Sequence, residues 1–94
     1  MKVKFNLYCE SGAIVAISNI MQKPCGLVVV GEVVIGTLSK MDAVYVQNGA
    51  KPPLHDQIKR IEADHEGIAV ATDGQLIGIC LTNRSKEDLV QHFN

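Results

Sequence analysis

Aromatic residues are scarce in this sequence, which has no tryptophan and only four other aromatic side chains, Phe5, Tyr8, Tyr45 and Phe93. Bases of single-stranded RNA commonly stack on such rings. Several of these four residues alternate toward the inside of their predicted strands, so the sequence does not favour RNA recognition by stacking. Sequence-specific reading of RNA is therefore not expected.

A strong net charge is also lacking. Nine Lys and Arg residues against ten Asp and Glu residues give a formal charge of −1, which supplies no overall field to attract nucleic acid or an anionic membrane. The longest apolar run, residues 26–38, contains Glu32 and is well short of the roughly 20 residues of a membrane-spanning helix. We expect no membrane span, and any contact with RNA has to be local.

Motifs for nucleotides and metals are missing as well. No GxxxxGK[ST] loop is present to hold phosphates, so the sequence excludes GTP hydrolysis. No CxxC or HxxxH spacing is present to preform a metal site, and we expect no cofactor. The amino-terminal residues MKVKFNLYCE have neither a long apolar core nor a small-residue cleavage site. They do not resemble a secretory signal, and a cytoplasmic location is expected.

Cysteine is sparse, and its spacing is irregular. Cys9, Cys25 and Cys80 are odd in number, widely separated and placed among apolar neighbours. This suits buried, reduced thiols better than a disulfide framework. Cys80 is expected to be buried and inert. Cys25 follows a proline in a predicted turn and is the most exposable of the three, but the sequence supplies no partner for it.

Residues with a high preference for β-structure are abundant. The length of 94 residues, 47% of them apolar, suits one domain with a single core, which we assign to residues 1–94. Residues 2–7 alternate between polar and apolar, as in a strand with one wet face. Residues 13–21 and 27–35 are rich in β-branched side chains and predict two more strands, the second bent near Gly31.

The next part of the chain predicts shorter elements. Residues 44–46 form a short strand, and the turn signal and the two prolines in residues 47–53 predict a loop. In residues 57–62 two isoleucines are three positions apart, which violates strict alternation. A strand there requires a bulge near Lys59 and Arg60.

The last part predicts a hairpin and a helix. Asp73-Gly74 is expected to join residues 68–71 and 76–81 in a β-hairpin. Ser85 is expected to cap a short helix over residues 86–91, with an acidic residue at the third helical position. The whole pattern predicts an all-β fold of six or seven strands, closed into a small barrel, with at most one short C-terminal helix.

The order of glycines and strands gives the chain a resemblance to a known family. Residues 26–38, GLVVVGEVVIGTL, followed by Asp42 and by VYV at residues 44–46, resemble the second domain of translation elongation factors. Residues 58–67, IKRIEADHEG, and the NRSKEDL of residues 83–89 are similar to that domain without a gap, especially to its elongation factor one-alpha branch. The resemblance covers about residues 26 to 91. It implies a closed barrel of the translation-protein type, like domain 2 of elongation factor Tu.

This resemblance implies binding rather than chemistry. In those factors the barrel is an accessory module that helps engage the ribosome and the acceptor end of aminoacyl-tRNA. We therefore predict a non-catalytic binding or adaptor module that contacts the ribosome or RNA. A protein–protein interaction module unrelated to translation is the alternative, and a small-ligand carrier ranks last.

Several residues depart from the family pattern. Glu32 and Ile35 stand where the family commonly has Arg, and Met41 stands where it has the Gly before Asp42. These departures put the RNA-facing charge of the family in doubt.

Four basic residues are the candidate binding patch: Lys59, Arg60, Arg84 and Lys86. They would contact phosphates if their strand and loop meet at one end of the barrel. Ordinary solvated surface is the competing interpretation.

Catalytic and metal-binding alternatives are weaker. Asp64-His65-Glu66 offers a base flanked by carboxylates, but adjacent residues point in different directions, so a solvated turn is expected. His55 and His65 could join a remote cysteine as metal ligands, but their spacing does not preform such a site. We expect neither an enzyme nor a metal site.

The tail of the chain raises a question of assembly. The family barrel is sealed by a strand after the helical turn, whereas here only residues 92–94 follow. An open edge would result, and a two-fold homodimer would pair it. The alternative is that residues 2–8 fill the gap within one chain and leave a monomer.

Overall fold

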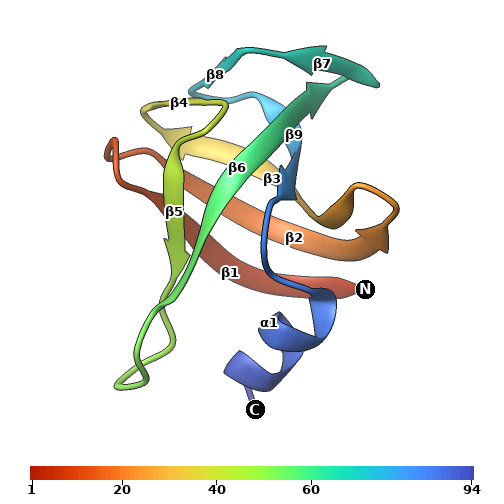
Figure 1. Cartoon of the computed structure of the whole chain (residues 1–94). Coiled ribbons are helices and arrows are strands. Elements are labelled where there is room, and N and C mark those ends of the chain that lie inside the picture. The colour runs from red at the N-terminus through yellow and green to blue at the C-terminus, as the bar shows by residue number, and fades with distance from the viewer.

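The computed structural model describes residues 1–94 and contains nine strands and one helix (Figure 1). The strands are β1 (Lys2–Cys9), β2 (Ile14–Lys23), β3 (Gly26–Ile35), β4 (Thr37–Ser39), β5 (Ala43–Val46), β6 (Leu54–Ala63), β7 (Glu66–Ile68), β8 (Val70–Thr72) and β9 (Leu76–Leu81). The helix, α1, spans Lys86–His92. It is the only helix, and it is not long and apolar enough to cross a membrane.

Six antiparallel strands close into a barrel. They follow the order β5-β1-β2-β3-β9-β6, and β6 pairs with β5 to complete the circle. β7 is an extra strand on β6, while β4 and β8 form a separate two-stranded sheet. The prediction of an all-β closed barrel with one short C-terminal helix is confirmed.

The amino-terminal strand closes the barrel. β1 lies between β2 and β5, with Leu7 opposite Val46 and Cys9 opposite Val44. Closure therefore occurs within one chain, as the monomer alternative supposed. The homodimer was predicted from an open edge, and that edge is paired within the chain. The homodimer stays a prediction, but an open edge no longer supports it.

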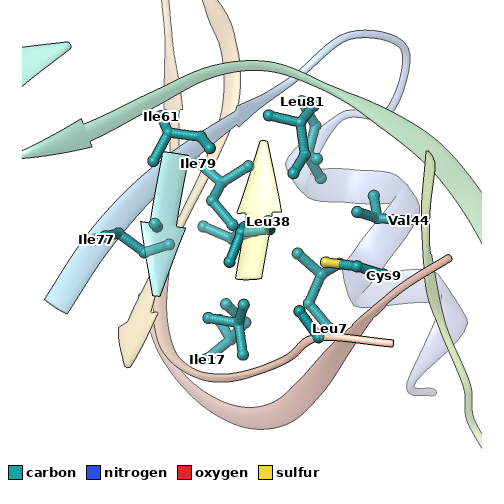
Figure 2. Packing of buried hydrophobic residues seen from close by; sticks show 14 of the residues in the cluster. Leu7, Cys9, Ile17, Leu38, Val44, Ile61, Ile77, Ile79 and Leu81 are labelled. Carbon is teal, nitrogen blue, oxygen red and sulfur yellow. The ribbon is translucent and has the colours of Figure 1, made fainter. Parts of the chain in front are cut away.

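The core fills the barrel and both of its ends. It is a cluster of 19 buried residues, and the inward-facing members from several strands are visible in Figure 2. Leu38 of β4 and Ala71 of β8 are fully buried at the end of the barrel where the small sheet lies, and Leu89 of α1 is buried at the other end (Figure 1). Each fully buried Leu contributes about 1.5–3 kcal/mol to stability relative to an exposed one.

A bulge in β6 explains the irregular isoleucine spacing. Ile58 and Ile61 are both fully buried, whereas Lys59 and Arg60 between them are exposed. The register of β6 against β9 shifts between Ile58 and Arg60, as expected when one strand carries an extra residue. The predicted bulge is confirmed, and it directs two successive cations away from the core.

The hairpin predicted at Asp73-Gly74 is wrong. A turn is present, closed by a bond from the Gln75 N–H to the Thr72 carbonyl at 3.2 Å. However, β8 pairs with β4, whereas β9 pairs with β3 and β6. The Gly74 N–H donates to the Val33 carbonyl, and the Val33 N–H donates to the Gln75 carbonyl. These two bonds direct the chain onto β3 after the turn, so the flanking strands separate.

Helix α1 is capped at both ends. Ser85 is the predicted N-cap, and its hydroxyl accepts from the Asp88 N–H while the Asp88 carboxylate accepts from the Ser85 N–H. At the other end the His92 carbonyl accepts from the Asn48 amide and from the Lys51 ammonium, each at 2.9 Å. The loop between β5 and β6 therefore holds a helix that would be too short to persist alone.

The closest approach of backbone to a glycine occurs at Gly31 of β3. A Cβ on Gly31 would clash with the Ala16 carbonyl oxygen, because the paired strands β2 and β3 shift in register beside this glycine. A Cβ on Gly78 would meet only a methyl group of Val28 at 3.7 Å, an ordinary contact. The tight bend of the barrel wall thus depends on Gly31.

We expect Gly31→Ala to lower the free energy of unfolding by about 3 kcal/mol or more, because the clash with backbone cannot relax by a side-chain rotation. Gly78→Ala is the matched control and should change it by less than about 1 kcal/mol. Urea unfolding followed by circular dichroism measures both values. Equal effects of the two substitutions would contradict this account of the bend.

Cys9 is a core residue whose thiol titrates abnormally. It is 4% exposed. Burial and, secondly, the negative charge of Asp42 raise the pKa of Cys9 from its ordinary value of 9.0 to about 11. The folded chain therefore keeps this proton at a pH where the unfolded chain has lost it, so its contribution to stability is complete below pH 9 and is lost as the pH rises toward 11.

We expect the free energy of unfolding to fall between pH 9 and pH 11 by on the order of 2 kcal/mol more in the native chain than in Cys9→Ala. The alanine variant provides the reference because its other titrating groups are unchanged. Urea unfolding at a series of pH values gives both curves. Parallel curves would show that Cys9 is not the group responsible.

Candidate functional site

Two of the four predicted basic residues, Lys59 and Arg60, lie together at the bulge of β6. The Lys59 ammonium donates to the Cys25 carbonyl at 3.0 Å, and the Arg60 Nε forms an ion pair with the Glu62 carboxylate at 3.0 Å. With Lys40 they line an open hollow of about 450 Å³. Part of their positive charge is therefore used within the chain.

Arg84 lies between β9 and α1, Lys86 is the first residue of α1, and neither lines that hollow. The Arg84 Nε donates to the His55 carbonyl at 2.9 Å, and the Lys86 N–H donates to the Gln22 side chain at 2.9 Å. The Arg84 N–H also donates to the Asp56 carboxylate at 2.7 Å. The four predicted residues thus have separate sets of partners, and Arg84 is held beside the start of β6.

Three rings form a row across the outside of the barrel. Tyr8 of β1 stands opposite Tyr45 of β5, and Tyr45 stands opposite His55 of β6. The ring centroids of the two tyrosines are 5.3 Å apart with planes 18° from parallel, and those of Tyr45 and His55 are 5.9 Å apart. Both tyrosines are half-buried, and His55 is exposed. We call Tyr8, Tyr45 and His55 the aromatic row.

Cationic and polar groups flank the aromatic row. Asn6 is exposed two positions before Tyr8 in β1 and so lies on the same side, and Lys4 is exposed nearer the start of the strand. Arg84 lies at the other end, because its guanidinium is bonded to the backbone of His55. The nearby Asp56 carboxylate accepts the backbone N–H groups of Asn83 and Arg84. Its negative charge is therefore partly satisfied within the chain.

A wide groove lies over other strands. Its volume is about 620 Å³, and its lining includes Val28 and Val30 of β3, Gly78 of β9 and His65. The missing side chain of Gly78 contributes to this hollow. The turn between β2 and β3, formed by Pro24 and Cys25, also borders it. We call this hollow the outer groove.

The two histidines considered as metal ligands lie at separate places on the surface. Asp64 and His65 form the two-residue turn between β6 and β7, both with positive φ, as in a type I′ hairpin. This is the turn expected from the sequence. His55 lies in the aromatic row and His65 in the outer groove. No group of three or more His, Cys, Asp or Glu side chains is arranged to hold a metal ion.

Sequence reasoning missed the aromatic row because its members come from three strands. Several of the four aromatic residues were expected to alternate inward, whereas Tyr8 and Tyr45 both lie outside the barrel opposite each other. The apolar neighbours of the tyrosines could have indicated their direction. If Leu7, Val44 and Val46 face the core, alternation along the strands places both tyrosines on the outside. That two outward rings meet depends on the pairing of β1 with β5, which lies outside any local pattern.

Comparisons with known proteins do not assign the chain to a family. No protein-family model matches the chain, and no curated protein matches it. The resemblance to elongation factor barrels therefore stays a prediction from the sequence, and what the chain does has to be argued from its own surfaces.

Proposed function

We propose that the chain is a non-catalytic binding module whose aromatic row binds single-stranded RNA. The observation that carries this proposal is the alignment of Tyr8, Tyr45 and His55 across three strands, with the Arg84 side chain fixed at one end. Stacking of a base on an aromatic side chain contributes about 1–3 kcal/mol and tolerates any base, because every base has a flat face.

The charges around the aromatic row support the same ligand. Arg84 lies beside His55 at one end of the row, and Lys4 lies about 13 Å from Tyr8 along β1, at right angles to the row. Phosphates of a strand laid along the row can therefore meet the Arg84 cation at the His55 end. The overall charge of −1 provides no general attraction, so affinity has to come from these local groups and from stacking.

The translation-associated role rests on the resemblance of residues 26–91 to the elongation factor barrel. Arg84 belongs to the NRSKEDL segment that carries part of this resemblance. The proposal therefore includes a cytoplasmic module that contacts RNA exposed in the translation apparatus. It assigns the contact to the aromatic row rather than to the four basic residues as one patch.

A protein-interaction module is the second candidate, and the outer groove favours it. The groove combines the half-buried Val28 and Val30 of β3 with Leu76, which is 72% exposed. Apolar patches of this kind on a protein surface commonly mark interaction sites. The groove and the aromatic row share no residues, so variants distinguish the two candidates.

Binding of a fluorescein-labelled oligouridine of about 12 nucleotides, followed by fluorescence anisotropy at low salt, tests the proposal. We expect Tyr45→Leu, which keeps apolar packing but removes the ring, to weaken binding about tenfold or more. Tyr45→Phe keeps the ring and should bind like the native chain. Affinity should also decrease as salt is raised, because phosphate contacts release counterions.

Lys23→Ala is the control, since this lysine is exposed, borders the outer groove and has no contact with the aromatic row. It should leave the affinity unchanged. Equal losses of affinity in Lys23→Ala and Tyr45→Leu would show that binding depends on general electrostatic attraction, which would overturn the proposal. Absence of binding to single-stranded RNA would also overturn it. Circular dichroism of each variant confirms that the barrel is intact.

A further inference from the structure

Two cysteines meet on the outside of the barrel. Cys80 of β9 is 4% exposed but does not belong to the core cluster, because it faces away from the barrel interior. Cys25, in the turn between β2 and β3, is exposed. The Cys80 thiol donates to the Cys25 sulfur, and the two sulfur atoms are 2.6 Å apart. Each is a free cysteine, and neither has a role in the proposed RNA contact.

The local backbone brings the two thiols together. Gly26 follows Cys25 with φ +129, and a Cβ at this glycine would lie 2.9 Å from the Leu81 carbonyl oxygen and 3.7 Å from the Cys80 sulfur. Only glycine allows the turn to pass this close to β9. The turn thereby covers Cys80 with Cys25 and leaves Cys25 as the thiol that meets solvent.

Lys59 completes the surroundings of the pair. Its ammonium donates to the Cys25 carbonyl at 3.0 Å. Burial and, secondly, the hydrogen bond with Cys25 raise the pKa of Cys80 to about 12, whereas the positive charge of Lys59 lowers it. In the reduced chain Cys80 therefore holds its proton, while the exposed Cys25 is accessible to a reagent from solution.

We propose that Cys25 and Cys80 form a reversible redox pair that exchanges with low-molecular-weight disulfides such as oxidised glutathione. The Cys25 thiolate attacks one sulfur of the external disulfide, which forms a mixed disulfide and releases one thiol. The Cys80 sulfur then attacks the Cys25 sulfur, loses its proton and releases the second thiol. The two cysteines lose two electrons and two protons, and the external disulfide gains them and becomes two thiols.

Formation of the bond connects the turn between β2 and β3 to β9. These segments border the outer groove, where Cys25 and Gly78 are both lining residues. Oxidation therefore fixes one wall of the groove, while the aromatic row on β1, β5 and β6 is unaffected. The inference stands independently of RNA binding, because the two sites use different strands.

Intact-mass spectrometry of the purified full chain after incubation with oxidised glutathione tests the pair. We expect the reduced native chain to lose about 2 Da, as required by loss of two hydrogens. Alkylation under denaturing conditions should then find one remaining thiol, which peptide mapping assigns to Cys9. Treatment with dithiothreitol should restore all three thiols, and the oxidised chain should melt at a higher temperature than the reduced one.

Single variants separate the two steps. Cys80→Ser should stop at a stable glutathione adduct on Cys25, and Cys25→Ser should react much more slowly under native conditions. Cys9→Ala, the control, should still lose about 2 Da. A native chain that stops at the mixed disulfide, or that keeps three free thiols throughout, would overturn the proposal. This measurement on the native chain needs no variant to fold.

Discussion

The pairing of β5 with both β1 and β6 is the contact on which the rest of the structure depends. It converts an open sheet into a closed one, so that every barrel strand has a neighbour on each side. Closure creates a single interior for the buried residues of strands that are distant in the sequence. It also sets Tyr8, Tyr45 and His55 in register on the outside, so the candidate RNA-binding surface is a direct product of the same closure.

Features determined by neighbouring residues could be predicted from the sequence. The spacing of Ile58 and Ile61 required a bulge because both side chains need the core, and the bulge is present. Ser85 was recognised as an N-cap because its hydroxyl and the acidic residue three positions later satisfy free N–H groups of the helix. The all-β class followed from β-branched runs interrupted by turn residues.

Features determined by distant strands could not be predicted in the same way. The turn at Asp73-Gly74 was recognised, but two backbone bonds to Val33 decide where the following strand goes. Likewise, the sequence supplied no partner for Cys25, whereas the turn between β2 and β3 places its sulfur against that of Cys80. The candidate site was the feature least predictable from the sequence, because all of its members come from different strands.

Closure has a kinetic consequence during synthesis of the chain. Val28 of β3 pairs with Cys80 of β9, so the apolar strand β3 lacks one of its neighbours until β9 has been synthesised. Barrels dominated by such distant pairings fold in milliseconds to seconds rather than microseconds. An unpaired apolar strand can meanwhile associate with another nascent chain. Rapid emergence of β9 therefore favours closure of the barrel, and a pause before β9 favours aggregation.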